Sequence, residues 1–426
     1  MARAVQSPEI MSVAVSGKSP PTTGVVLAAA AALGAYEAGV LSHIVIDVAR
    51  EVGRAQLFDL VSGTSAGAIN ALALGAYAHD PIGGVTRMCE TWSGLRLGQI
   101  LRPSAIELLR MLIDLNDVTS RIARALTVRA ARGGLLDSRP IATLLERAIP
   151  IERLHANLAA GIVRSVAITT THVASGRAAV FHETFGTAPG SAGHGLDLIT
   201  TRLGTRHALA SASIPLMFPP VMIDGDLYCD GGLRQLVPLS PSVHLGARRL
   251  LVINPLAQTD DPIARQARRE ALTSPIYLAG KALNALLFDR TEIDLARLAQ
   301  ITGVLRAGRR RFGPTFDGEL NDELERAGAA TLHEVKAVAI SPSQDLGQLA
   351  AAYATSPELE RRERGVITSL VRRLGESGAA RSGDLLAFLL FDGGFASQLI
   401  ALGRRDAIAH HDELLELFAP DGSPAA

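Results

Sequence analysis

A serine between two glycines, placed where an apolar strand passes into a helix, constrains this chain more than any other feature. Residues 57–62 form a short apolar segment suited to a buried strand, and residues 66–78 are small, apolar and helix-favouring. Ser65 lies in the turn between them, flanked by Gly63 and Gly67. In a nucleophile elbow the serine occupies such a strained turn, where larger flanking side chains would collide with the neighbouring strand and helix. Because the motif also occurs by chance, its position between strand and helix carries the prediction.

The rest of the chain continues the alternation of strands and helices. Residues 25–27 predict a buried strand, and residues 35–49 predict a helix because apolar residues recur every four positions. Further strands are predicted at residues 163–170, 178–182, 248–253 and 335–340, and further helices at 262–300, 357–374 and 383–418. This alternation favours an α/β fold with a central, mainly parallel sheet between helices and a mainly helical C-terminal extension.

Composition excludes several classes of partner. Lys plus Arg and Asp plus Glu both total 42, so a formal charge of zero gives no reason to expect nucleic acid. Cys89 and Cys229 cannot form a disulfide framework, and no metal motif such as H-E-x-x-H is present. His410 and His411 are adjacent, so on a helix they point in different directions. We therefore expect no nucleic acid, no metal and no cofactor.

No segment is apolar for long enough to span a membrane. The longest near-continuous apolar run, residues 25–36, has about a dozen residues where ~20 are needed. The long polar lead before it disfavours a signal peptide, and we expect residues 1–23 to form a disordered tail. The mixed Arg and Leu helices predicted at residues 106–113 and 122–126 face the core or, alternatively, touch a lipid surface. Arg309 to Arg311 form a short basic cluster that we expect in a solvated loop.

A serine nucleophile requires a base, and the residues leave two arrangements open. Ser65, Asp230 and His244 follow the chain order of a Ser–His–Asp triad in α/β-hydrolases, although His244 falls in a predicted helix. Alternatively Asp230 is itself the base. Gly231 and Gly232 follow it and allow the close backbone approach that a carboxylate at a strand end needs, although Asp-Gly is also an ordinary turn signal.

Three motifs, in this order, resemble the patatin-like phospholipase family. Residues 63–70 read Gly-Thr-Ser-Ala-Gly-Ala-Ile-Asn, residues 212–220 read Ala-Ser-Ile-Pro-Leu-Met-Phe-Pro-Pro, and residues 230–232 read Asp-Gly-Gly. The resemblance implies a serine lipid acyl hydrolase that cleaves carboxylic esters through a Ser–Asp dyad. Carried over by position, Ser65 is the nucleophile and Asp230 the base. Burial would raise the pKa of such an aspartate from ~3.9, as its role requires.

The chain departs from this family in the oxyanion loop. Family members carry Gly-Gly-Gly-x-Arg-Gly after the first strand, whereas residues 29–34 here read Ala-Ala-Ala-Ala-Leu-Gly. The loop residues Ala29, Ala30, Ala31 and Gly34 all keep their backbone N–H donors. An alanine at positive φ would nevertheless add a strain of roughly 1–2 kcal/mol. The sequence therefore leaves open a catalytically weakened module that binds lipid or protein.

The resemblance also predicts how the chain is divided into domains. It covers most of residues 24–255, which we expect to form the catalytic domain. Residues 256–419 are expected to be a mainly helical region packed on that domain, and residues 420–426 a tail. Because acyl lipids reside in bilayers, we expect a cytoplasmic protein that makes transient, peripheral contact with membrane surfaces.

Overall fold

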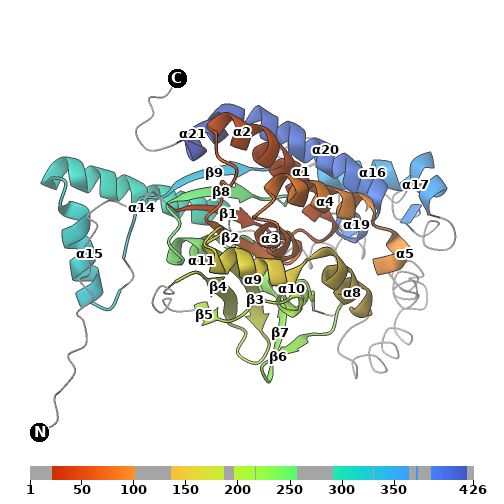
Figure 1. The fold of residues 1–426 in the computed structure, drawn as a ribbon, viewed down its shortest axis with the longest axis horizontal. Coiled ribbons are helices and arrows are strands. Elements are labelled where there is room, and N and C mark those ends of the chain that lie inside the picture. The colour runs from red at the N-terminus through yellow and green to blue at the C-terminus, as the bar shows by residue number, and fades with distance from the viewer. Residues whose placement is uncertain are drawn as a thin grey trace, which may run out of the picture.

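One sheet organises the molecule (Figure 1). The computed structural model describes residues 22–100, 136–186, 196–215, 217–256, 291–329, 331–363, 371–372 and 385–419. The strands run in the order β5-β4-β3-β2-β1-β8-β9. They are β1 (Thr23–Leu27), β2 (Leu60–Thr64), β3 (Ser165–His172), β4 (Ala178–Thr184), β5 (Leu196–Thr200), β8 (Arg249–Ile253) and β9 (Lys336–Ile340). Beside this path, β7 (Asp226–Asp230) pairs with β3 and with β6 (Val221–Ile223).

The sheet is mainly parallel, which confirms the α/β prediction. β1 pairs in parallel with β2 and β8, β2 with β3, and β8 with β9. Antiparallel pairing occurs between β3 and β4 and along β7. Residues 1–21 of the tail predicted at 1–23, the helices predicted at 106–113 and 122–126, and residues 262–290 of the helix predicted at 262–300 lie outside the described residues. The tail prediction is wrong at Thr23, which begins β1.

Helices cover both faces of this sheet. The N-terminal half contributes the 3-10 turn η1 (Ala31–Leu33), α1 (Gly34–His43), the π-helical turn η2 (Ile44–Val48), α2 (Ala49–Val52), α3 (Ala66–Ala76), α4 (Pro81–Ser93), α5 (Leu97–Ile100), α8 (Arg139–Ala148), α9 (Ile151–Ala159), α10 (Thr205–Ser211), η4 (Gly231–Leu233) and α11 (Leu239–His244). The C-terminal part contributes α14 (Thr291–Phe312), α15 (Phe316–Arg326), α16 (Leu346–Ala354), α17 (Pro357–Arg362), α19 (Leu385–Leu389), α20 (Gly393–Ala409) and α21 (His411–Phe418).

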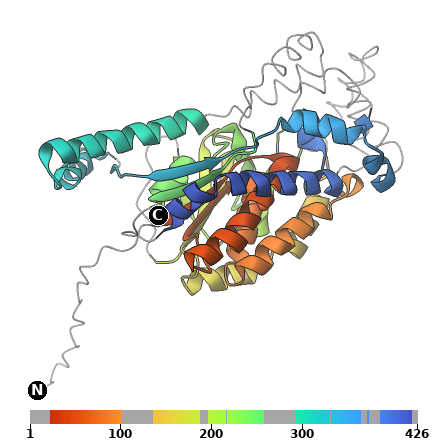
Figure 2. The same ribbon diagram turned by 90° about the horizontal axis from the view of Figure 1, so that it is seen from above.

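The buried side chains alternate along the central strands, as period-two geometry requires. Val25 and Leu27 belong to the large core cluster, whereas Val26 belongs to a smaller cluster on the opposite face. On the larger side, α1, α4 and α20 pack against one another (Figure 2). On the other side, α11 contacts β1 and β2.

Close approach between α1 and α20 depends on two glycines. A Cβ at Gly39 would lie 2.2 Å from the carbonyl oxygen of Ile400, and a Cβ at Gly403 would lie 2.2 Å from that of Tyr36. The Tyr36 hydroxyl donates to Asp406 Oδ2 at 2.9 Å across the same contact. The backbones of α1 and α20 are therefore in direct contact. Buried side chains of α20 and of β1 belong to the same hydrophobic core cluster.

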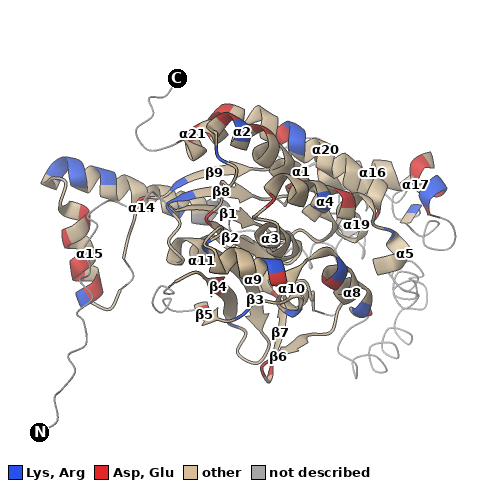
Figure 3. Ribbon diagram, viewed as in Figure 1, with Lys and Arg blue, Asp and Glu red and all other residues tan. Residues whose placement is uncertain are grey.

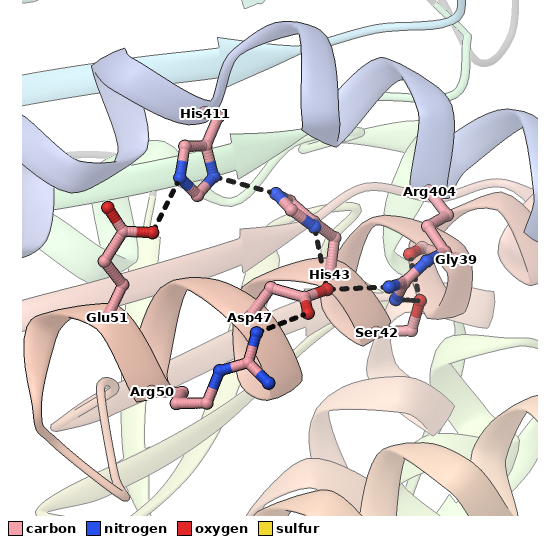
Figure 4. Close-up of polar contacts among 8 residues, drawn as sticks. All are labelled: Gly39, Ser42, His43, Asp47, Arg50, Glu51, Arg404 and His411. Carbon is pink, nitrogen blue, oxygen red and sulfur yellow. Dashed lines mark hydrogen bonds and ion pairs between the residues drawn. The ribbon is translucent and has the colours of Figure 1, made fainter.

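Polar contacts extend this seam to α21 (Figure 4). His43 bonds to Asp47 Oδ2 at 3.0 Å and, through its other ring nitrogen, to His411 Nδ1 at 3.0 Å. His411 continues to Glu51 Oε2 at 3.1 Å, and Arg404 donates to Asp47 at 2.7 Å. Burial lowers the pKa of His43, although Asp47 acts in the opposite direction. The network ties the two ends of the described chain together.

Contrary to the expectation drawn from the apolar run at residues 25–36, residues 31–52 form one helical stretch, within the described part of the chain, that is long and apolar enough to cross a membrane. Of its most apolar window, 83% is buried inside the protein. Contact with α3, α4 and α20 accounts for this apolar character, as in a core helix.

The basic cluster at Arg309, Arg310 and Arg311 lies in the last turn of α14, so the prediction of a loop there is wrong. Cations are favourable at a helix C-terminus, and Arg309 is further held by contacts to Asp317 and Glu334. Figure 3 shows these charges on α14 beside the acidic residues of α15.

Candidate active site

Ser65 occupies a strained turn between β2 and α3. Its backbone has φ 56° and ψ −121°, one of three positive-φ conformations among the described non-glycine residues. A Cβ at Gly63 would lie 2.1 Å from the carbonyl oxygen of Gly67, and a Cβ at Gly67 would lie 2.4 Å from that of Leu27. Neither position accommodates a side chain. The structure thus has the elbow geometry that the spacing predicts.

Ser211, which sequence reasoning missed, supports this turn from α10. The Ser65 N–H donates to Ser211 Oγ at 2.8 Å, and that hydroxyl donates to the carbonyl of Thr169 at 2.6 Å. These two hydrogen bonds link the elbow to α10 and β3. No local pattern marks Ser211, because its partners lie 146 and 42 positions away in the sequence.

Asp230 ends β7 and is completely buried. Its Oδ1 accepts from the Gly232 N–H at 2.7 Å, whereas Oδ2 has no hydrogen-bond partner among the described residues. A Cβ at Gly231 would lie 2.2 Å from the carbonyl oxygen of Thr169, so this glycine is required by close packing. Backbone and neighbours thus fix the carboxyl group with one oxygen free.

Burial raises the pKa of Asp230 to about 6. The Gly232 N–H and the nearby Ser65 hydroxyl act in the opposite direction, because each stabilises the carboxylate. At neutral pH the group is therefore mostly ionised, yet it is a much stronger proton acceptor than a solvated aspartate.

One pocket brings the two residues together. Ser65, Asp230 and the loop residues Ala29, Ala30 and Ala31 all line it. The rest of its wall is mainly apolar and comes from α3, α4, α5, α8 and α19. An apolar pocket with a few convergent polar groups is typical of a small-molecule or acyl-chain site.

The alanine loop contributes backbone donors to this pocket. The Ala29 N–H is occupied by the carbonyl of Leu236 at 2.8 Å. For the N–H groups of Ala30, Ala31 and Ala66, the described residues provide no acceptor. Ala66 follows the serine at the start of α3, where the helix dipole also favours negative charge. These groups can serve as donors to an oxyanion.

The strain anticipated for this loop occurs at Ala31. Its φ is 47°, whereas Ala30 has φ −145°. Gly34 has ordinary helical angles, φ −57° and ψ −18°, and is needed for packing, since a Cβ there would lie 2.8 Å from Ala66 Cβ. The chain therefore holds a left-handed alanine where a glycine would be unstrained.

We expect Ala31→Gly to raise the free energy of unfolding by roughly 0.5–1 kcal/mol, because relief of left-handed strain exceeds the entropic cost of glycine. Ala30→Gly, at negative φ, is the matched control and should lower it by a similar amount. Chemical denaturation measures both. Equal destabilisation by the two changes would show that Ala31 carries no strain.

A buried polar network behind the loop was also missed from the sequence. Asn70 donates to Glu37 Oε2 at 2.8 Å and to the carbonyl of Gly34 at 3.0 Å, and accepts from Trp92 Nε1 at 3.0 Å. Burial raises the pKa of Glu37 well above its usual range, which favours the neutral acid. The signal for this network in the sequence was Glu37, an acidic residue within the predicted core helix at residues 35–49. The network holds α1, α3 and α4 in register around the pocket.

His244 does not join this site. It lies at the end of α11 and bonds to the carbonyl of Ser240 at 2.7 Å. It is absent from the residues that line the pocket, and Asp230 makes no hydrogen bond to it. The Ser–His–Asp alternative therefore lacks the contacts that a triad needs. Among the described residues, no three His, Cys, Asp or Glu side chains are grouped so as to hold a metal ion.

Comparisons with known proteins show to which family the sequence is similar. The sequence model of the patatin-like phospholipase family matches residues 25–243, just over half of the chain. No curated protein matches this chain. Among solved structures, VipD from Legionella pneumophila is similar at 11% identity, over 88% of this chain and 92% of that one, with a TM-score of 0.26. A likeness at that score carries no argument about function.

Proposed function

Because this chain belongs to the patatin-like phospholipase family, we propose that it hydrolyses the carboxylic esters of acyl lipids with Ser65 and Asp230 as a dyad. The observation that carries the proposal is the shared pocket, in which a strained serine and a buried carboxylate with a free oxygen face an apolar wall. The substrate resides in bilayers, so the proposal includes transient contact with a membrane surface.

The reaction follows from the free oxygen of Asp230. As Ser65 Oγ attacks the ester carbonyl carbon, its proton moves to Asp230 Oδ2 and the carbonyl oxygen becomes an oxyanion. The N–H groups of Ala30, Ala31 and Ala66, with the N-terminus of α3, stabilise that charge. When the ester bond breaks, the leaving alkoxide takes the proton from Asp230.

The second half of the reaction repeats these roles with water. Asp230 accepts a proton from water as the hydroxide attacks the acyl group on Ser65, and returns it to Ser65 Oγ as the free fatty acid leaves. The carboxyl group alternates between base and acid, so it needs a pKa close to the working pH. The raised pKa of about 6 meets this requirement.

The test is hydrolysis measured against pH. We expect the purified protein to release fatty acid from phospholipid vesicles or soluble esters, with kcat/KM falling about tenfold per pH unit below a midpoint near 6, because protonated Asp230 cannot accept the serine proton. Product release measured by mass spectrometry between pH 4.5 and 8 gives the profile.

The same fall in activity below a midpoint near pH 6 should occur in His244→Ala, since that histidine lies outside the pocket. Circular dichroism at the lowest pH checks that the fold is intact. If folded protein hydrolyses no acyl ester at any pH, the proposed function fails and the catalytically weakened binding module is favoured.

A further inference from the structure

The pocket that contains Ser65 continues along one face of α3. Ile69, Ala73 and Tyr77 line it, and each follows the preceding one by four positions, counted from Ser65. Residues four apart lie on the same face of a helix. Their side chains therefore form one wall that begins at the serine and runs away from it.

Residues of two more helices complete the lining of this channel. α4 contributes Gly84 and Met88, and α8 contributes Ile141 and Leu145, again at a spacing of four. Most side chains in this stretch are small or apolar, with Asn70, Arg87 and Thr91 as polar exceptions, and this lining favours a hydrocarbon chain.

Tyr77 lines the pocket at the C-terminal end of α3, distant from Ser65. Its hydroxyl donates to the carbonyl of Ala148 on α8 at 3.3 Å. Gly84 of α4 lies against it, because a Cβ at that position would be 2.4 Å from Tyr77 Cβ. The exposed Arg87 guanidinium lies 5.9 Å from the ring centroid. One aromatic side chain thus joins all three helices at the far end.

The distance between the serine and this end fixes the length of chain that fits. Ser65 and Tyr77 flank α3 at its two ends and are twelve positions apart, which corresponds to ~18 Å of helix. Carbon–carbon bonds of about 1.5 Å at tetrahedral angles advance an extended chain by ~1.25 Å per carbon. After allowance for van der Waals contact at both ends, about 10–14 carbons fit.

We infer that the acyl chain of the substrate lies along α3 between Ser65 and Tyr77, and that Ala73 and Tyr77 select acyl groups of medium length. The inference rests on the proposed function for the position of the cleaved ester. Ala73, eight residues from the serine, faces the middle of the chain and is small enough to let it pass.

Ala73→Phe tests the channel by obstructing it midway. We expect the ratio of kcat/KM for a dodecanoyl ester to that for a butanoyl ester to fall at least tenfold, because only the longer chain must pass position 73. Ala156→Phe is the matched control, since that residue is exposed on the neighbouring helix α9, and it should leave the ratio unchanged. An equal fall for both esters would overturn the inference.

Tyr77→Ala tests the far end of the channel with a change that removes bulk. Opening the end should raise the ratio of hexadecanoyl to dodecanoyl hydrolysis at least tenfold, and an unchanged ratio would overturn the role of Tyr77. Displacement of a bound fluorescent fatty acid by acids of 4 to 18 carbons gives a readout that needs no turnover. Selective binding of medium chains without hydrolysis would leave the channel standing while the proposed function fails. Binding without dependence on chain length would overturn the channel.

Discussion

Replacing Ser65 with Ala should reduce ester hydrolysis by about 10⁶-fold, the loss that accompanies removal of the nucleophile in a serine hydrolase. The hydroxyl is the only group at this turn that can form the acyl-enzyme, and the backbone strain that presents it is unchanged by the substitution. A fluorophosphonate probe should label the wild-type protein and fail to label Ser65→Ala, with the adduct located on residue 65 by mass spectrometry.

Ser240→Ala is the matched control for this loss. Ser240 is exposed on α11 and is not among the residues that line the pocket. It should keep full labelling and hydrolysis. Undiminished hydrolysis by folded Ser65→Ala would remove the serine from the mechanism.

Replacing Asp230 with Asn should lower kcat by about 10²–10⁴-fold, the usual worth of a positioned general base. The amide oxygen of asparagine can still accept from the Gly232 N–H, so the turn is kept, but the amide cannot take the proton of Ser65. The residual activity should no longer fall below a midpoint near pH 6, because the titrating carboxyl group of Asp230 is gone.

Two variants make this prediction specific. Asp226→Asn changes an exposed carboxylate on the same strand, β7, and should leave kcat unchanged. His244→Ala should also retain activity, since its ring bonds to Ser240 rather than to Asp230. Abolished hydrolysis in His244→Ala, with Asp230→Asn active, would restore a histidine-dependent mechanism.

Much of the site was predictable because its signals are local. The motif at Ser65 spans five residues, and Gly63 meets a steric limit inside it, since a Cβ there would contact the carbonyl of Gly67. The limit on Gly67 comes instead from Leu27 at the end of β1. The order of motifs also placed Asp230 with the serine, although 165 positions separate them. Ser211 was invisible by comparison, because a serine in a short helix has no pattern that reports its contacts with Ser65 and Thr169.

The alanine loop shows the limit of such reasoning. Alanine at residues 29–31 left the backbone conformation open, since the five consecutive alanines at 28–32 are compatible with strand, helix or turn. The structure assigns positive φ to Ala31 and extended φ to Ala30 because of what surrounds them, including the Leu236 carbonyl that binds the Ala29 N–H. No local propensity distinguishes the two residues.

The sequence by itself determined the elbow and the strands that match β1, β2, β3, β4, β8 and β9, because periodicity and small-residue spacing act over a few neighbouring positions. It did not predict β5, β6 or β7, the last of which carries Asp230. Tertiary structure alone decided which side chains share the pocket. It left His244 outside the pocket, placed β9 beside β8, brought Gly39 against Ile400, and joined Tyr77 to Ala148 of α8. These outcomes depend on packing between segments far apart in the chain, and packing energy depends on the shapes of both partners.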